Sequence, residues 1–426
     1  MLPRLLLPVL FAALAPAEIH HLGLKESVDL ALKLNPDILL ARLDAEIAAQ
    51  QVRVVHDPFL PKLYAGSGLA YSSGFPLSVE GSVPSVVRAS SVATLINREQ
   101  HYLVEQAKET AKGAGLETQS RQDLIVRRVF QLYFAAGRAG RSASMGRRQA
   151  DSARKALEII SERVRGGREL PLEEKKAQLD LARSNQRANG LEAERALAET
   201  LLAAVVGFAP GDLLRPIEEN KPSFIIPESE QAAVEAALRS NHEIGRLESD
   251  VRAKGFQAES GRAGKLPRLD LLGEYALLAR FNNYEDFFKG FKRHNVQLGV
   301  SFVLPIFGGK AGEAKAAQAE AEAGKLRLRL DSARRRIATE VRQAWLDVKK
   351  AEGGREVSRL ELDVARDNLG VLLARYEEGR AGLREVEQAR LVENEKWLQY
   401  YDAEHALDRA RIELVGLAGG LLATLR

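Results

Sequence analysis

One stretch decides the fold of this chain: Val296-Gln-Leu-Gly-Val-Ser-Phe-Val-Leu-Pro-Ile-Phe-Gly-Gly-Lys310. Its first half has the period of a β-strand with one apolar face, formed by Val296, Leu298, Val300, Phe302 and Leu304. Pro305 ends the pattern because proline has no N–H to donate to a sheet. Gly308-Gly309 permits a sharp turn. We therefore expect a strand over 296–304 that ends in a strand-to-helix junction.

The chain changes character after this junction. No proline occurs from residue 311 to the end, and the composition is that of long helices. Spacings of three and four residues predict two coiled-coil seams. The first is Ile337, Val341, Ala344, Val348 and Ala351, and the second is Val357, Leu360, Val364, Asp367, Val371 and Ala374. A straight helix from Gly309 to Gly379 would be about 100 Å long.

The first half of the chain recurs in the second half at a constant offset, with no gap. Leu60-Pro61-Lys-Leu63 recurs as Leu266-Pro267-Arg-Leu269, and the preceding helical residues recur as well. Each proline is expected where a helix gives way to a strand, because its fixed φ and missing N–H suit that junction. The repeated helical residues are Val28, Ala31, Leu32 and Asn35, matching Val234, Ala237, Leu238 and Asn241.

Two glycine turns repeat at a second, slightly larger offset. Arg163, Gly167 and Arg168 match Arg375, Gly379 and Arg380, and the helical regions 98–167 and 309–379 have similar lengths. Each half is predicted to run helix, strand, loop, strand, long helix, turn, helix. We assign residues 18–206 to the first repeat and 228–426 to the second, joined by a proline-containing connector over 207–227.

The N-terminus is typical of a secretory signal peptide. Arg4 is followed by a short apolar run and by Ala15-Pro-Ala17. The alternative is a buried N-terminal helix. Residues 1–17 are predicted to be removed on export, and any membrane insertion must then use strands, because no other apolar run approaches a spanning helix.

Four strands are predicted, over residues 63–71, 83–95, 269–280 and 296–304. Their length suits strands that cross a bilayer at a tilt. Four strands cannot close a barrel around a lumen, and open sheet edges are not viable in lipid. Several chains would therefore share one barrel. The aromatic loop 281–291 is expected to be either a membrane-interface or outer loop, or a packed loop.

Catalytic and nucleic-acid-binding functions find no support in the residues. The chain has no cysteine, which excludes disulfides, zinc–thiolate sites and a lipid-modified cysteine. The adjacent pairs Glu173-Glu174 and Glu377-Glu378 do not face each other on a helix, and Gly308-Gly309-Lys310 is not a phosphate loop. The net charge of +4 arises from interleaved charges with no one-sided basic patch. We expect no enzyme, no cofactor, no metal site and no nucleic-acid partner.

The duplicated pattern resembles the bacterial outer membrane efflux (TolC-like) family. The residues that carry the resemblance are the two Leu-Pro-x-Leu motifs, Leu304-Pro-Ile-Phe-Gly-Gly-Lys310, and Arg375-Tyr-Glu-Glu-Gly379 followed by Glu385-Val386 and Ala389. The resemblance implies a mainly helical fold with strands. It also implies a homotrimer with a twelve-stranded barrel in the outer membrane of a Gram-negative-type bacterium, and a periplasmic α-helical tunnel. The partners it implies are a periplasmic adaptor and an inner-membrane pump of the RND, ABC or MFS type.

The same resemblance places a gate and an adaptor contact at the turns. It implies gate positions at Tyr376 and Glu385, with Arg380 or Arg384 as substitutes for a basic partner that is Ala381 here. Gln388 stands where some members carry a second acid. The tips implied for adaptor contact are Arg163, Gly167, Arg168, Arg375 and Gly379. Glu385 could instead be a solvated helix-face residue beside Ala381 and Ala389.

A second class of protein stays open from the sequence. An exported coiled-coil scaffold or adaptor without a pore would also carry long helical hairpins. Such adaptors usually have one hairpin rather than two full strand–helix repeats, so the channel of an efflux or type I secretion system is the favoured interpretation. The sequence names no exported substrate.

Overall fold

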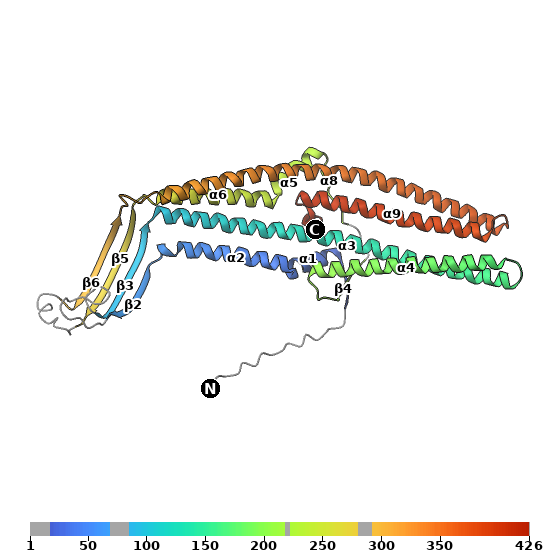
Figure 1. The fold of residues 1–426 in the computed structure, drawn as a ribbon, viewed down its shortest axis with the longest axis horizontal. Helices are drawn as coiled ribbons and strands as arrows, with labels where there is room; N and C mark the ends of the chain where they lie inside the picture. Colours follow the sequence, from blue (N-terminus) through green and yellow to red (C-terminus); the bar gives the residue numbers. More distant parts are fainter. Residues whose placement is uncertain (1–17, 69–84, 218–221, 280–291, 426) are drawn as a thin grey trace, which may run out of the picture. The chain divides into compact units, whose positions relative to one another are not determined.

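The computed structural model describes residues 18–68, 85–217, 222–279 and 292–425 (Figure 1). The predicted signal peptide and the aromatic loop 281–291 lie outside these residues. The chain divides into two compact units, and the long helices α3 (Arg98–Arg165) and α8 (Ala311–Glu377) contribute to both. The first unit is Met1–Leu40, Ser120–Asn241 and Arg335–Arg426, and the second is Ala41–Gln119 and His242–Arg334.

The second unit contains a four-stranded antiparallel sheet of order β2-β3-β5-β6. The strands are β2 (Lys62–Gly68), β3 (Ser85–Ile96), β5 (Arg268–Leu278) and β6 (His294–Val303). The four predicted strands are therefore confirmed. Some of their predicted end residues lie outside the described part of the chain. Among the residues that the structure describes the sheet is open, because β2 and β6 each have a strand on one side only.

One face of this sheet is apolar and exposed. The register sets Leu271 opposite Val300 and Leu269 opposite Phe302, so the large side chains of β5 and β6 share a face. The other face carries the charged pairs. There Arg88 Nε lies 2.9 Å from Glu274 Oε1, and the Thr94 hydroxyl donates to Asp270 Oδ1 at 3.0 Å. The alternation at 296–304 thus has the predicted consequence, an amphipathic sheet.

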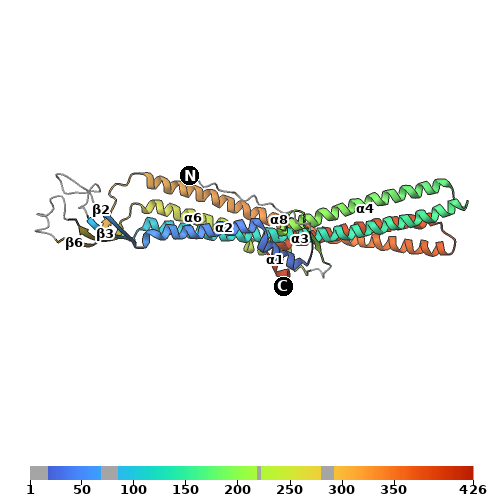
Figure 2. The ribbon, with the colours of Figure 1, turned by 90° about the horizontal axis from the view of Figure 1, so that it is seen from below.

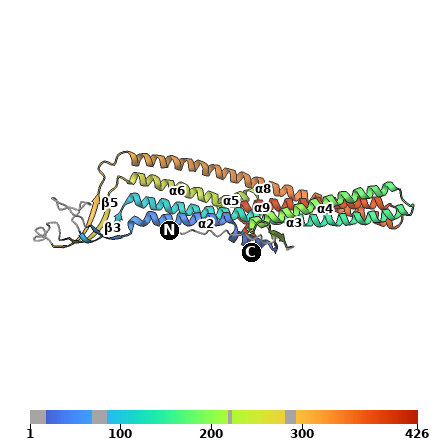
Figure 3. The same cartoon turned by 60° about the horizontal axis from the view of Figure 1, so that its bottom comes forward.

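Four helical segments lie side by side in the second unit, in the order α2 (Pro36–His56), the start of α3, α6 (His242–Ala263) and the start of α8 (Figure 3). The Thr118 hydroxyl on α3 donates to the Ala41 carbonyl of α2 at 2.9 Å. Arg252 on α6 pairs with Glu109 on α3 at 3.0 Å. A close backbone approach joins α6 to α8, where a Cβ on Gly312 would lie 2.7 Å from the Gly261 carbonyl oxygen.

This approach predicts opposite effects for two glycine-to-alanine changes on α8. Gly312→Ala should lower the free energy of unfolding by about 1–3 kcal/mol, because the methyl group collides with backbone that cannot yield. Gly324→Ala should raise it by up to about 1 kcal/mol, because nothing lies within 4 Å of that position and alanine favours the helix. Thermal unfolding of both variants checks this, and equal shifts would contradict the close approach.

Two helical hairpins lie side by side in the first unit, in the order α8, α9 (Leu383–Leu417), α3, α4 (Pro171–Val206) (Figure 1). Figure 2 shows α3 and α4 joined at their turn. Ion pairs connect α9 to α3, including Arg138–Asp402 at 2.7 Å and Arg127–Glu413 at 2.9 Å. The α8–α9 pair is tied by Lys396 and Glu361 at 2.8 Å.

The two predicted seams of α8 differ in outcome. The first is buried as predicted, with Ile337, Val341 and Val348 at most 1% exposed. The second is not buried within the chain, since Val357, Leu360, Val364 and Val371 are all more than half exposed. The frame of the first seam continues instead to Leu362 and Ala365, which are buried. The second seam therefore occupies a different face of α8.

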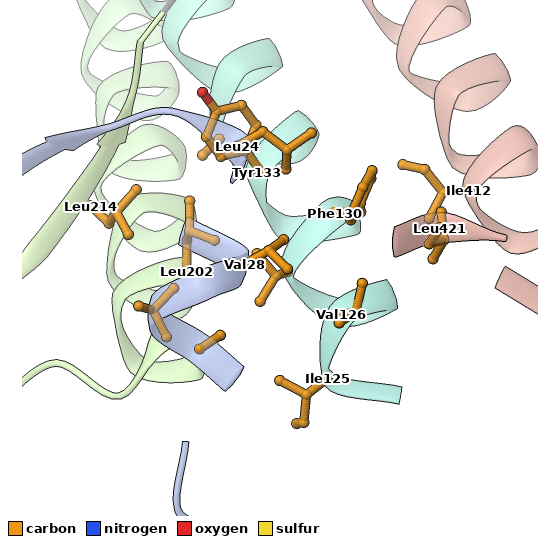
Figure 4. Packing of buried hydrophobic residues seen from close by; sticks show 14 of the residues in the cluster. Leu24, Val28, Ile125, Val126, Phe130, Tyr133, Leu202, Leu214, Ile412 and Leu421 are labelled. Carbon is orange, nitrogen blue, oxygen red and sulfur yellow. The ribbon is translucent and has the colours of Figure 1, made fainter. Parts of the chain in front are cut away.

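The apolar core of the first unit surrounds Phe130 of α3 (Figure 4). Leu24 and Val28 of α1 (Leu24–Leu34), Leu202 of α4 and Ile412 of α9 pack into it. Further elements of this unit are β1 (Ile19–Leu22), the parallel strand β4 (Leu213–Pro216), α5 (Glu230–Ser240) and the short 3-10 helix η2 (Leu421–Leu425). The 207–227 region thus contains a strand that its prolines conceal in the sequence.

Residues 24–56 form two helices, α1 and α2, that meet at Asn35. Its side-chain oxygen accepts from the Asp37 amide at 3.0 Å, and its side-chain nitrogen donates to the Val205 carbonyl at 2.8 Å. The next residue, Pro36, disfavours the helical conformation at Asn35, and the backbone there is extended, with ψ of 125°. Among the described helices, none is both long and apolar enough to cross a membrane.

Candidate gate at the two hairpin turns

The α3–α4 and α8–α9 turns have the same backbone geometry. Gly167 and Gly379 have φ of 68° and 72°, a left-handed conformation that glycine adopts without strain. The Arg168 amide donates to the Arg163 carbonyl at 2.8 Å, and the Arg380 amide donates to the Arg375 carbonyl at 2.7 Å. These repeated residues therefore form the turns through their backbones.

Three side-chain contacts connect one hairpin to the other near the turns. The guanidinium of Arg163 on α3 donates to the Tyr376 hydroxyl on α8 at 3.3 Å. Arg384 on α9 lies 3.9 Å from Glu173 on α4. Arg390, further along α9, donates to the Ser152 hydroxyl on α3 at 2.9 Å. The contacts hold the α8–α9 turn against the α3–α4 turn.

The predicted gate residues take different positions. Tyr376 and Arg384 take part in contacts between the hairpins. Glu385 accepts a hydrogen bond from the Gly382 amide at 2.9 Å and so caps the start of α9. Arg380 pairs with Glu378 beside it in the turn at 3.1 Å. Gln388 is exposed on α9.

Sequence reasoning did not find the partners on the opposite hairpin, Ser152 and Glu173, or the pair Glu387 and Arg390. Burial raises the pKa of the Glu387 carboxyl, and the Arg390 guanidinium at 3.1 Å opposes this. A hydrogen bond from Lys176 lowers the pKa of Glu173, and Arg384 adds to the lowering. The contacts between hairpins join segments that are far apart in the chain, so no local pattern marks them. Glu387 and Arg390, in contrast, have the i, i+3 spacing of an ion pair within one helix.

The predicted strand–helix junctions lie at the ends of the sheet. Pro61 and Pro267 stand directly before β2 and β5, after turns closed by the Leu60 amide on Asp57 and the Leu266 amide on Ala263. Pro305, Gly308 and Gly309 connect β6 to α8, and Gly309 has φ of 68°. Ile306 and Phe307 between them are more than 90% exposed.

An open, amphipathic sheet joined twice to long helical hairpins defines a class, the channel proteins of bacterial outer membranes. The chain belongs to the outer membrane efflux protein family, which matches residues 27–208 and 233–420. The two matched segments follow the internal duplication. The chain is thus an outer-membrane efflux channel and not an enzyme. Members of this family work with an adaptor and an inner-membrane pump.

Solved structures of the same fold cover most of the chain. The Campylobacter jejuni CmeC outer membrane channel aligns with a TM-score of 0.74 and 18% identity, over 93% of this chain and 85% of that one. The outer membrane protein VceC of Vibrio cholerae aligns with a TM-score of 0.72 and 16% identity, over 93% and 96%. The open-state Neisseria gonorrhoeae MtrE channel aligns with a TM-score of 0.71 and 18% identity, over 94% and 89%. No curated protein matches the chain.

Proposed function

We propose that three copies of this chain close one twelve-stranded barrel in the outer membrane and one helical tunnel in the periplasm. The open, amphipathic sheet is the observation that carries this proposal. Its edge strands β2 and β6 have unpaired backbone groups that lipid cannot satisfy. Because β2 runs toward the loops and β6 runs back from them, β6 of one copy can pair antiparallel with β2 of the next.

The two faces of the sheet fit this arrangement. The apolar face of β6, with Leu298 83% exposed, faces lipid. The charged face, with the Arg88–Glu274 pair, lines the lumen. Exposed apolar residues on α2, namely Leu40, Leu43, Ile47 and Val54, recur at spacings of three, four and seven and suit packing between copies.

The contacts at the hairpin turns act as a latch on the tunnel. Tyr376 and Arg163 hold α8 to α3, and Arg384 and Glu173 hold α9 to α4. Releasing them frees the α8–α9 hairpin to move away from the α3–α4 hairpin, which is how the tunnel opens. The bond from the Gly382 amide to Glu385 is already explained by capping of α9. Glu385 can therefore act in the gate only through its charge, as a carboxylate that occurs three times near the tunnel axis.

Partners and processing complete the proposal. The turns around Gly167 and Gly379 meet the adaptor, and an RND, ABC or MFS pump supplies the substrate and the energy. Residues 1–17 direct export and are then removed. N-terminal sequencing of the mature protein would begin near Glu18 if this is right, and a retained Met1 would contradict it.

Tyr376→Phe tests the latch. Removing the hydroxyl deletes the bond from Arg163, worth ~1 kcal/mol per copy, so resting open probability should rise at least about fivefold. The measurement is single-channel recording in planar bilayers. Tyr400→Phe on α9, away from the turns, is the matched control and should behave like the parent. Equal resting conductance in the parent and both variants would show that the Tyr376 hydroxyl does not hold the gate closed.

The same recordings test the function itself. The parent protein, extracted with detergent from an outer-membrane fraction, should insert and give stepwise conductance. Recovery of the chain in the soluble periplasm, with no conductance after addition to a bilayer, would favour the exported scaffold instead.

A further inference from the structure

The second seam of α8 is an exposed apolar stripe near the hairpin turn. Val357, Leu360, Val364 and Val371 recur at spacings of three or four, or their sum, and Val364 is 69% exposed. These residues lie on the side of α8 away from the buried Leu362 and Ala365. An uninterrupted solvated face would carry charge at such positions, so this stripe is built to pack against another helix.

A second stripe of matching period lies on α4, at the other side of the helix order α8, α9, α3, α4. Leu172 and Leu179 are about half exposed, and Lys175, Ala182 and Gln186 continue the three-and-four spacing on the same exposed face. Within the chain, α4 packs against α3 through a different face, and α8 packs against α9 through a different face. Both stripes therefore lack a covering element among the described residues of their own unit.

Each stripe contains one charge, and the two charges are opposite. Asp367 interrupts the α8 stripe, and Lys175 interrupts the α4 stripe. Neither has an opposite charge three or four residues away on its own helix. Neighbouring charges differ in this respect, since Lys176 pairs with Glu173 and Arg359 pairs with Asp363. A lone charge in an apolar seam fixes register when its partner comes from the facing helix.

The positions of the two turns determine which residues of the two stripes lie at the same level along the tunnel axis. The Arg163–Tyr376 contact places the two turns of one chain at the same level, and a rotation axis along the tunnel repeats that level in every copy. Val371 lies eight residues before Gly379, and Lys175 lies eight residues after Gly167. Val364 and Ala182 are likewise fifteen residues from their turns. α4 leaves its turn while α8 approaches its own, so they would pack antiparallel.

We propose that the α8 stripe of one copy packs against the α4 stripe of the next, with Asp367 paired to Lys175 across the seam as the register-setting contact. In the level alignment the two charges differ in height by four residues, about 6 Å, which a lysine side chain spans. The inference rests on the proposed assembly of several copies and specifies which surfaces meet.

Charge reversal tests the pairing. Lys175→Glu and Asp367→Lys should each raise the fraction of dissociated chains at least about tenfold, because each leaves two like charges in a desolvated seam. The double variant should return that fraction to within about threefold of the parent. Native mass spectrometry in detergent measures the fractions. Singles that dissociate without recovery in the double, or singles that stay assembled, would overturn the pairing.

Cross-linking tests the alignment independently, because the natural chain has no cysteine. Lys175→Cys combined with Val371→Cys should form a disulfide between copies and give covalent oligomers on a denaturing gel. Lys175→Cys with Gly370→Cys is the control, one residue away but about 100° around α8. An oligomeric protein with no cross-link, or with equal cross-linking in both, would refute the seam alone. A monomeric parent would refute the seam and the proposed assembly together.

Discussion

Leu298→Arg should prevent stable assembly of the protein in the outer membrane. Leu298 lies at the middle of β6, 83% exposed on the apolar face of the sheet. A charged side chain facing lipid at the midplane costs about 2–4 kcal/mol, and a shared barrel repeats that cost in every copy. Membrane fractionation and immunoblotting should show at least about a tenfold loss of assembled protein.

Gln297→Arg is the matched control for this change. It introduces the same side chain one residue away, on the opposite face, where the register sets Gln297 directly across from Glu274. The arginine would meet water and a carboxylate there, so assembly should stay near the parent level. If both variants assemble equally well, the apolar face of β6 does not contact lipid.

Glu199→Gln should cause a large loss of stability in the first unit. The Glu199 side chain is 3% exposed, and its Oε1 accepts from Arg195 at 2.8 Å and from Arg215 at 3.0 Å. These bonds fasten β4 to α4. Breaking a buried ion pair costs about 3–5 kcal/mol, and the low end applies because Arg215 is one-third exposed. Thermal unfolding measures the loss.

Glu199 should also affect how the free energy of unfolding depends on pH. Burial raises the pKa of this carboxyl, but the bonds from Arg215 and Arg195 outweigh burial and bring the pKa below the ordinary value of 4.5. A lowered native pKa contributes stability above the unfolded pKa, and that contribution disappears as pH falls through the native pKa. The parent should therefore lose stability below about pH 4.5, and Glu199→Gln should lose less over that range.

Glu194→Gln on the same helix controls for a general loss of charge. Glu194 is 58% exposed and lies 3.8 Å from Arg138. An exposed pair of this kind contributes about 0–1 kcal/mol, so the variant should unfold within a few degrees of the parent. If the Glu194 and Glu199 variants are equally destabilised, the network around β4 is not what stabilises this unit.

Local residue patterns account for most of what the sequence predicted. Alternation at 296–304 predicted a strand, and the two sets of recurring residues predicted that the strands and long helices would each occur twice. The glycines at 167 and 379 predicted turns, since few other residues adopt their φ. Each of these features depends on neighbours in the chain or on direct repetition, which is why one sequence sufficed.

What the sequence did not predict depends on contacts between distant segments. The periodicity of Val357, Leu360 and Val364 indicated a helix seam, but it could not say whether the covering helix belongs to the same chain. β1 and β4 are too short to show a period, and they pair although they lie in distant parts of the chain. At the turns, Tyr376 could be selected from the sequence, whereas its contact with Arg163 follows only from packing of the two hairpins.

We propose that several copies of this chain complete one barrel, because a single chain supplies only an open four-stranded sheet among its described residues. Native mass spectrometry of protein released by mild detergent from the outer-membrane fraction tests this most directly. We expect a complex of three chains. A stable single chain released under the same conditions would contradict it.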